Sequence, residues 1–226
     1  MEKNYLDIQR AIGAAAISVG RNPGEVAVVA VSKTVGMPEV QRAREAGIRD
    51  FGENRSPLFL QKQQAFPGER WHFIGHIQTN KLKDVVGRAS LIHSVATRHA
   101  LEVISRLAIE RQARQAVLIE VNVSGEASKD GAASQDLPSL LEAAGQLPGV
   151  EVRGLMTMAP VLRSEHDDAA RETFASLRRL RDNLAPDYAD ADTISLNELS
   201  MGMSDDFEDA VKEGATLVRI GRRLWS

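Results

Sequence analysis

The 226-residue sequence predicts a (β/α)8 barrel of the TIM type, an α/β fold formed as a single domain with an extra helix at its N-terminus. Eight short apolar segments alternate with amphipathic stretches at roughly 28 residues per unit, which fits this barrel better than an open doubly wound sheet. The first apolar segment shows no polar alternation, as expected for a strand buried on both faces. No linker, low-complexity run or composition break divides residues 1–226.

The chain is expected to begin with a helix over residues 1–20. Its apolar residues recur at spacings of three and four, which is the period of one helical face. These residues are Tyr5, Ile8, Ile12, Ala15 and Val19. Gly20 and the turn at residues 22–24 end this helix. Because only residues 221–226 follow the last strand, too few for a full final helix, we expect residues 1–20 to cover part of that flank.

Eight strands, with helices between them, are expected along the rest of the chain. The strand candidates are residues 26–31, 48–51, 71–74, 91–94, 117–123, 150–156, 193–196 and 216–220. Pro38 opens a helix that ends at Gly47. The clearest helix begins at the candidate cap Ser164, carries one apolar stripe and ends before Pro186. This alternation of strands and helices is typical of a parallel sheet.

The composition excludes several classes of function. A balance of 28 basic and 31 acidic residues gives a net charge of −3, so coating nucleic acid is not the expected task. The absence of cysteine excludes disulfides, thiol nucleophiles, iron–sulfur clusters and cysteine-bound zinc. No segment is long and apolar enough to span a bilayer, and residues 1–5 lack the apolar run of a signal peptide. We therefore expect a cytoplasmic protein with neither a nucleic-acid nor a membrane partner.

Lys33 is the first candidate functional residue, because barrel active sites lie at the C-terminal ends of the strands. It directly follows the first apolar run, and we expect it alone of the seven lysines to be embedded at the end of a buried strand. Desolvation lowers the pKa of an amine and frees the lone pair that attacks a carbonyl group. The alternative is a lysine that extends from the barrel rim into water. A phosphate-binding loop of the P-loop type is excluded because the glycines of that motif do not precede Lys33.

Polar residues follow three other predicted strands. Each set has both a functional and a structural interpretation. Asn54 follows the second strand as a candidate ligand-binding residue or as the cap of the next helix. His72 and His76 lie four apart, but their neighbours predict a strand and no third ligand is evident, so no metal site is expected. Residues 122–126 form a polar strand exit or an ordinary turn.

A phosphate site is expected between the loops that follow the seventh and eighth strands, where barrels often hold this group. Ser200, Gly202 and Gly221 are the candidate contacts, since glycines let backbone N–H groups approach an anion. Ser204 is either a ligand or the cap of a helix whose first turn carries Asp205 and its neighbour. Those carboxylates would repel a phosphate that pointed directly at them.

Taken together, these segments resemble the pyridoxal phosphate homeostasis protein family, whose fold is similar to the N-terminal barrel of alanine racemase. The matching motifs are AVSKT at 30–34, FGEN at 51–54, WHFIG at 71–75, RGLM at 153–156, LSMGMSDD at 199–206 and VRIG at 218–221. The resemblance implies a barrel that carries pyridoxal phosphate (PLP) as an aldimine on Lys33, with Arg219 facing the pyridine nitrogen. The cofactor-binding residues then comprise Lys33, Asn54, Ser200, Gly202, Ser204, Arg219 and Gly221.

This resemblance implies a cofactor carrier without catalytic residues. A guanidinium can only donate hydrogen bonds, so it favours an unprotonated pyridine nitrogen and a poorer electron sink. The similar racemases also need a tyrosine base from a second domain, and neither Tyr5 nor Tyr188 follows a predicted strand. We therefore expect a protein of vitamin B6 homeostasis that buffers PLP or delivers it to apo PLP-dependent enzymes.

Two other functions remain open. A PLP-dependent, racemase-like enzyme could use an unrecognised base, of which His76 is the nearest candidate. The barrel could instead be a scaffold for protein interactions. Two departures from the family pattern, Arg55 and residues 222–225, leave the shape of the cofactor mouth and the C-terminal packing open.

Overall fold

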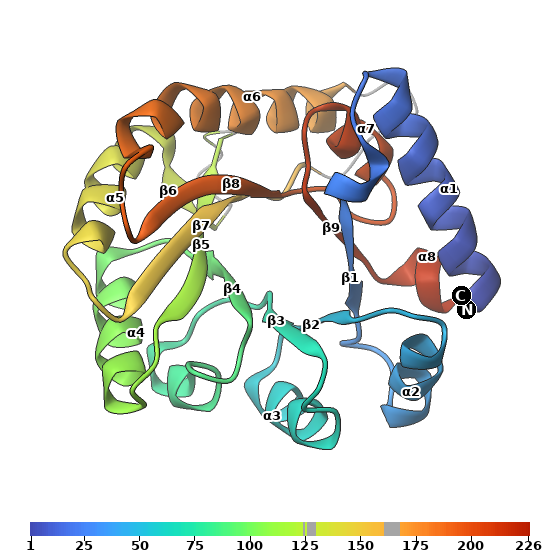
Figure 1. Ribbon diagram of the computed structural model, residues 1–226, viewed down its shortest axis with the longest axis horizontal. Coiled ribbons are helices and arrows are strands. Elements are labelled where there is room, and N and C mark those ends of the chain that lie inside the picture. Colours follow the sequence, from blue (N-terminus) through green and yellow to red (C-terminus); the bar gives the residue numbers. More distant parts are fainter. Residues whose placement is uncertain (124, 126–129, 161–167) are drawn as a thin grey trace.

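The computed structural model describes residues 1–123, 125, 130–160 and 168–226. Within these residues, eight parallel strands form a closed barrel with helices around its outside (Figure 1). The barrel strands are β1 (Ala27–Val31), β2 (Asp50–Glu53), β3 (Arg70–Phe73), β4 (Leu91–Val95), β5 (Gln115–Asn122), β7 (Val150–Met156), β8 (Ile194–Ser200) and β9 (Leu217–Ile220). The predicted TIM-type barrel is therefore confirmed.

The strands follow one another around the barrel in the order β4-β3-β2-β1-β9-β8-β7-β5, and pairing between β4 and β5 closes the ring. A short strand, β6 (Ala132–Ala133), pairs with the end of β5. All eight predicted strands are present. The largest difference is that β8 continues to Ser200, past the expected end at Leu196, because the polar residues Asn197 and Glu198 interrupt its apolar pattern.

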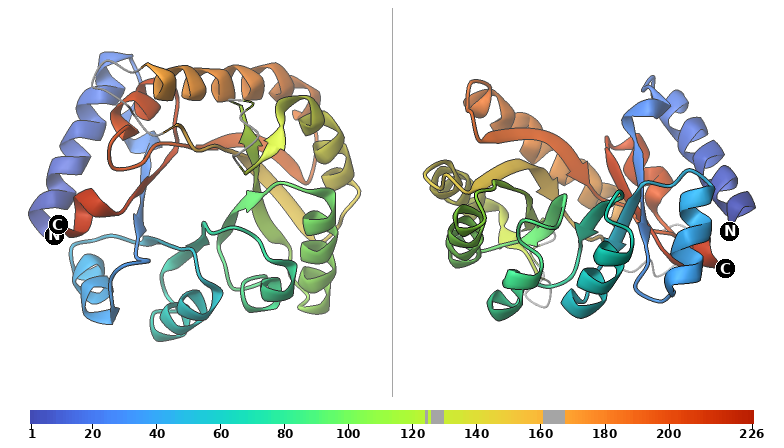
Figure 2. Two further views of the ribbon diagram at one scale, coloured as in Figure 1. Left: turned by 180° about the vertical axis from the view of Figure 1, so that it is seen from behind. Right: turned by 60° about the horizontal axis from the view of Figure 1, so that its bottom comes forward.

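Helices occupy connections between the strands and both ends of the chain (Figure 2). They are α1 (Glu2–Ser18), α2 (Met37–Glu45), α3 (Ser56–Ala65), α4 (Arg98–Glu110), α5 (Leu137–Gly145), α6 (Ala169–Leu184), α7 (Phe207–Lys212) and α8 (Arg222–Trp225). Short 3-10 turns lie at η1 (Pro23–Glu25), η2 (Thr79–Asp84), η3 (Ser134–Asp136) and η4 (Ala185–Tyr188). The expected cap Ser164 lies outside the described residues. None of the helices in the described ranges combines the length and apolar character needed to cross a membrane.

The N-terminal helix lies against the last elements of the chain, and the two termini are side by side in both orientations (Figures 1 and 2). Asn4 donates hydrogen bonds from Nδ2 to the carbonyl oxygens of Leu224, at 3.2 Å, and Ser226. Arg21 donates to the carbonyl oxygens of Val211 and Ala215 at the end of α7. Helix α1 therefore lies on the flank where the four-residue α8 is too short to cover the barrel.

The barrel interior combines an apolar cluster with a polar one. The apolar cluster consists of Val29, Leu91, Ala116, Leu118, Met156 and Leu217. Because side chains alternate along a strand, the residues two positions after Leu91 and Leu217, His93 and Arg219, face the same interior. Both are buried and joined through Ser200. The interior thus places polar side chains toward the C-terminal ends of the strands.

Asp50, at the start of β2, marks the N-terminal rim of the barrel. Its carboxylate accepts two hydrogen bonds from Arg70, at 2.6 and 2.5 Å, and lies 3.1 Å from Nε2 of His72. Burial alone would raise the pKa of this carboxyl, but the hydrogen bonds from His72 and Arg70 and the charge of Arg70 outweigh burial and hold the pKa below its usual value.

We expect Asp50 to stabilise the fold above the ordinary carboxyl pKa and to lose this effect as the pH falls through its lowered value. Asp50→Asn should therefore cost about 1–3 kcal/mol at neutral pH, with a smaller difference in acid. Urea unfolding of both proteins at pH ~7 and pH ~3 measures this. An equal difference at both pH values would contradict the expected linkage.

Candidate functional site

A pocket of about 480 Å³ opens at the C-terminal ends of the strands. It brings together residues that lie far apart in the sequence, from the ends of β1, β2 and β9 and from the loop between β8 and α7. Its lining includes five residues that the sequence predicted for the site, namely Lys33, Asn54, Ser204, Arg219 and Gly221. The position of this pocket agrees with the general location of barrel active sites.

Lys33 contributes an amine to this pocket from just beyond β1. The expected burial of its side chain is wrong: β1 ends at Val31, Ser32 is the last buried residue, and the Lys33 side chain is exposed. Among the lysines that the structure describes, the buried one is Lys62. Lys33 therefore reaches the pocket from its solvent side.

Lys62 belongs to a buried polar cluster at Ser32, the residue before Lys33, and the sequence pattern did not indicate this cluster. Its Nζ lies 2.6 Å from Oε1 of Glu53 and donates to the carbonyl oxygen of Ser32 at 2.7 Å. Both charged side chains are almost completely buried. The spacing of three residues between Phe59 and Lys62 could have indicated that Lys62 is buried, because it places both side chains on the same face of α3. The cluster ties α3 to the ends of β1 and β2.

Asn54 lines the pocket and carries a buried hydrogen-bond acceptor without a partner in the described residues. Among the described residues, its buried Oδ1 atom has no hydrogen-bond partner, and a buried acceptor of this kind is costly unless a ligand or water satisfies it. Gly75 allows β3 to approach closely, because a Cβ there would lie 2.1 Å from the carbonyl oxygen of Asn54. The alternative role of Asn54 as a cap is wrong, since Arg55 precedes the first residue of α3.

Arg219 lies on β9 and its buried guanidinium lines the inner end of the pocket. Nη1 donates to Oγ of Ser200 at 2.7 Å, and Nη2 donates to the carbonyl oxygen of Thr157 at 3.0 Å. Burial lowers the pKa of Arg219 to about 10, although the charges of Asp206 and Glu120 act in the opposite direction. The guanidinium remains positively charged at neutral pH.

Ser200 and Gly202 are placed differently from the other expected residues, since neither is among the described residues that line the pocket. The Ser200 hydroxyl lies behind the pocket between Arg219 and His93. Gly202 has a φ of +91°, and a Cβ there would meet the Cβ of Ala210 at 2.5 Å. This glycine allows the turn to pack closely against α7.

The loop before α7 arranges its polar groups so that Ser204 faces the pocket. The alternative of Ser204 as a helix cap is wrong, because α7 begins at Phe207 and the residue before it is Asp206. The Asp206 carboxylate instead accepts a hydrogen bond from the backbone N–H of Met203 at 2.6 Å. Oγ of Ser204 accepts one from the backbone N–H of Arg223 at 3.3 Å.

The two carboxylates of this loop differ in their surroundings. Burial raises the pKa of Asp206, an effect that its hydrogen bond from Met203 and the charge of Arg219 partly offset. Asp205 forms an exposed ion pair with Arg222, which also lines the pocket. This pairing reduces the repulsion that the sequence analysis expected between these acids and a phosphate, and it places a guanidinium beside Gly221.

His76 lines the pocket but is largely exposed, with Nδ1 3.4 Å from a carboxylate oxygen of Asp130. Tyr5 lies at the opposite rim of the barrel, where α1 meets the starts of β1 and β2. In the described part of the chain, no group of three His, Asp or Glu side chains is positioned to hold a metal ion. The charged groups that define the pocket are therefore an amine and two guanidiniums, with one carboxylate at its edge.

Comparisons with known proteins give consistent results. Residues 15–225 match the family model of the alanine racemase N-terminal domain. The pyridoxal phosphate homeostasis protein of Aquifex aeolicus is 42% identical to this chain, over 91% of this chain and 89% of the relative. The protein of the same name from Pseudomonas aeruginosa is also 42% identical, over 99% of this chain and 94% of the relative.

A solved structure adds a ligand to this comparison. The structure of PipY from Synechococcus elongatus PCC7942, with PLP bound, superposes on this chain with a TM-score of 0.80 at 32% sequence identity. The similarity covers 95% of this chain and all of PipY.

Proposed function

Since the chain belongs to the pyridoxal phosphate homeostasis protein family, we propose that it binds PLP in the pocket at the C-terminal ends of the strands and buffers or delivers this cofactor in vitamin B6 homeostasis. The observation that carries the proposal is the convergence of Lys33, Asn54 and Arg219 on one pocket, with Ser204 and Gly221 at its edge. These residues offer an amine for an aldehyde, a free acceptor for a hydroxyl and cationic groups for a phosphate and a ring nitrogen.

Lys33 is the residue that we assign to covalent binding. Its Nζ attacks the aldehyde carbon of PLP, and the carbon–nitrogen double bond forms as one water molecule leaves. Its exposed side chain lines the pocket, so its amine is accessible to a cofactor that enters from solvent. The buried Lys62 is unsuited to this role, because its amine is held by Glu53 and Ser32.

The remaining residues hold and orient the ligand. Ser204, the backbone around Gly221 and the Arg222 guanidinium are the proposed phosphate contacts, and Arg219 is the proposed donor to the pyridine nitrogen. PLP supplies an electron sink when it is bound, and its ring is a poorer sink when the nitrogen is unprotonated. A buried cation at this nitrogen disfavours its protonation, which supports a carrier over a catalyst.

The positions of two side chains considered as second bases, His76 and Tyr5, also support a carrier. A general base must lie within ~2.6–3.2 Å of the proton that it removes, or act through one water molecule. His76 is mostly exposed and paired with Asp130, and Tyr5 lies at the opposite rim. Apo PLP-dependent enzymes are the proposed recipients, and a cytoplasmic location is part of the same proposal.

The proposal predicts that the purified protein gains a visible absorbance band when PLP is added, without appreciable racemisation, transamination or decarboxylation of common amino acids. An absorbance titration and a turnover assay over a panel of amino acids measure both properties. Robust turnover that Lys33→Ala abolishes would contradict the carrier function and support a racemase-like enzyme. A spectrum identical to that of free PLP would leave the barrel as a scaffold.

Delivery and buffering are distinguished by a transfer assay. PLP-loaded protein is mixed with an apo PLP-dependent enzyme in the presence of a scavenger for free PLP, and recovery of the enzyme's activity is followed. Direct delivery predicts recovery faster than release of PLP into the scavenger. Recovery at the rate of release would restrict the function to buffering.

A further inference from the structure

An unbroken series of polar contacts crosses the interior of the barrel from the cofactor pocket to the opposite rim. Arg219 contacts Ser200 at 2.7 Å, and Oγ of Ser200 lies 2.9 Å from Nδ1 of His93. Nε2 of His93 lies 2.8 Å from Nδ1 of His72, whose Nε2 lies 3.1 Å from the Asp50 carboxylate. We call these five residues the interior relay.

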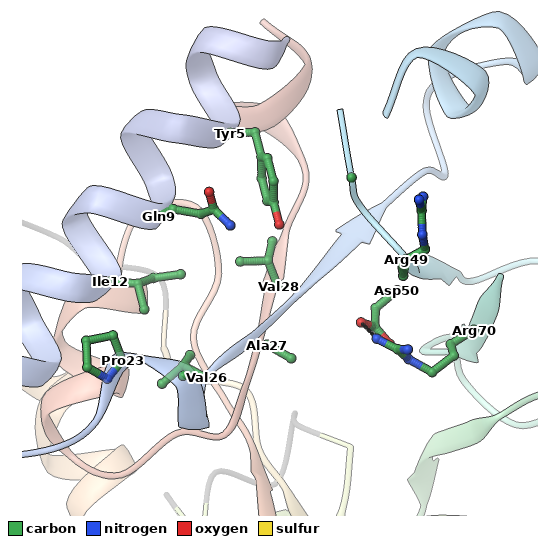
Figure 3. Close-up of a pocket in the computed structure, with 12 residues that line it drawn as sticks. Tyr5, Gln9, Ile12, Pro23, Val26, Ala27, Val28, Arg49, Asp50 and Arg70 are labelled. Carbon is green, nitrogen blue, oxygen red and sulfur yellow. Dashed lines mark hydrogen bonds and ion pairs between the residues drawn. The ribbon is translucent and has the colours of Figure 1, made fainter. Parts of the chain in front are cut away.

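The relay is shielded from water over most of its length. Ser200 and His93 have no exposed surface, and His72 and Arg219 are only 4% and 5% exposed. Its far end is at a second pocket, where Asp50 faces Arg70 below Tyr5 and Gln9 of α1 (Figure 3). Because buried polar atoms need partners, the direction in which each proton is donated is strongly constrained.

The two end residues set that direction. Arg219 can only donate, so Ser200 accepts from it, and the single hydroxyl proton of Ser200 is directed to Nδ1 of His93. The ionised Asp50 can only accept, so His72 presents N–H at Nε2 to it. A neutral His93 then carries its proton on Nε2 and donates it to Nδ1 of His72. Every polar atom in the series is satisfied with both rings neutral.

The opposite direction leaves atoms unsatisfied. If His72 carried its only proton on Nδ1, the lone pair at Nε2 would face the Asp50 carboxylate. If His93 donated to Ser200, the serine would accept two hydrogen bonds and its own proton would lose the acceptor on His93. Burial of the ring lowers the pKa of His93 well below its usual value, which agrees with a neutral ring.

We propose that His93 is a positioning residue for the cofactor site, which acts through Ser200 to hold the Arg219 guanidinium toward the pocket. The inference rests on the proposed function, because it concerns the contact between Arg219 and the pyridine nitrogen of PLP. By accepting the Ser200 proton, His93 fixes the serine as an acceptor and so fixes one side of the guanidinium. The N–H groups that Ser200 and Thr157 do not engage are then available to the ligand.

The relay also determines how the site responds to pH. In the described part of the chain, the charged or titratable groups near its members are Asp206 and Glu120 near Arg219, Arg70 and Tyr5 near Asp50, and His72 and Arg219 near His93. While the interior relay is intact, Arg219 donates a hydrogen bond to the pyridine nitrogen of bound PLP. Water therefore does not protonate that nitrogen. If Arg219 is released, the nitrogen becomes free to titrate, and the absorbance of bound PLP becomes dependent on pH.

The first test uses the apo protein and needs no ligand. Nitrogen-15 NMR of histidine-labelled protein distinguishes the two neutral tautomers of each ring, and His72→Asn and His93→Gln assign the signals. The relay predicts a proton on Nε2 of both His72 and His93. A proton on Nδ1 of His93 would overturn the proposed direction whether or not the protein binds PLP.

The second test compares PLP binding and the absorbance spectrum between pH ~6 and pH ~8. Ser200→Ala and His93→Leu are expected to weaken binding about 3- to 10-fold and to make the spectrum depend on pH, as expected for the loss of one hydrogen bond. His93→Gln, whose amide can accept from Ser200 and donate to His72, should preserve the spectrum of the original protein. Ser105→Ala removes another buried serine hydroxyl, on α4, and serves as the matched control.

The outcomes separate this inference from the proposed function. Failure of the unmodified protein to bind PLP would contradict the proposed function and leave the tautomer result standing. Normal binding in the unmodified protein, with the same affinity and pH-independent spectrum in Ser200→Ala and His93→Leu, would overturn the positioning role alone. If His93→Leu does not fold, Ser200→Ala and the tautomer measurement still decide the proposal.

Discussion

Lys33→Ala is expected to abolish the covalent attachment of PLP and to weaken its binding about 10- to 100-fold, which corresponds to roughly 1.4–2.8 kcal/mol. The substitution removes the amine that lines the pocket but leaves Arg219, Ser204 and Gly221 in place. Since the Lys33 side chain is exposed, its truncation creates no cavity in the core, and the protein should remain folded. Borohydride reduction followed by peptide mass mapping measures the attachment directly.

The structure provides a matched control for this experiment. Lys81 is also exposed and lines an adjoining pocket that shares Asn54 with the first. Lys81→Ala should therefore leave the reduced pyridoxyl group on Lys33 unchanged. A label found on Lys81 or Lys129 but not on Lys33 would refute the assignment, and equal labelling of Lys33→Ala and the original protein would do so as well.

The positions of the barrel strands were predictable because each strand coincides with a short run of apolar residues. The run at residues 26–31 is one example, and β1 occupies all but its first residue. The pattern was less informative where a strand carries polar residues, as in β8, whose last four residues follow Leu196. The predicted end of a strand is therefore displaced when side chains that face water interrupt an otherwise buried segment.

The candidate site was partly predictable for a related reason. Lys33 and Asn54 follow their strands directly, and a parallel barrel brings all such positions to one end. The interior contacts were not predictable, because Ser200 and His93 are 107 positions apart and meet only when the barrel closes. Each residue in isolation has several ordinary roles, and their donor and acceptor directions follow from a network that the sequence does not display.

The buried pair of Lys62 and Glu53 shows the same limit, and it leads to the largest expected effect on stability. Lys62 interrupts the apolar face of α3, where a pattern based on hydrophobicity expects a nonpolar residue. The side chain is nonetheless buried because Glu53 supplies a charge at 2.6 Å and Ser32 supplies two oxygens. A pattern of hydrophobic residues therefore cannot predict that Lys62 is buried unless its partners are known.

Lys62→Met is expected to lower the free energy of unfolding by about 3–5 kcal/mol, because it leaves the Glu53 carboxylate buried without its cationic partner. Methionine has a similar length, so the loss reflects the uncompensated charge more than a cavity. Urea unfolding measures the effect. Lys212→Met, which removes an exposed lysine paired with Asp209 on α7, should cost no more than about 1 kcal/mol.

A second variant distinguishes the effect of the unpaired charge on stability from the effect of altered packing. Replacing Glu53 by Gln in the Lys62→Met protein removes the unpaired charge, and this double variant should recover more than half of the lost stability. Because Lys62 also donates to the carbonyl oxygen of Ser32, the residue before Lys33, the single variant should bind PLP more weakly as well. A loss below about 1 kcal/mol in Lys62→Met would contradict a buried ion pair at this position, since that value is typical of exposed pairs.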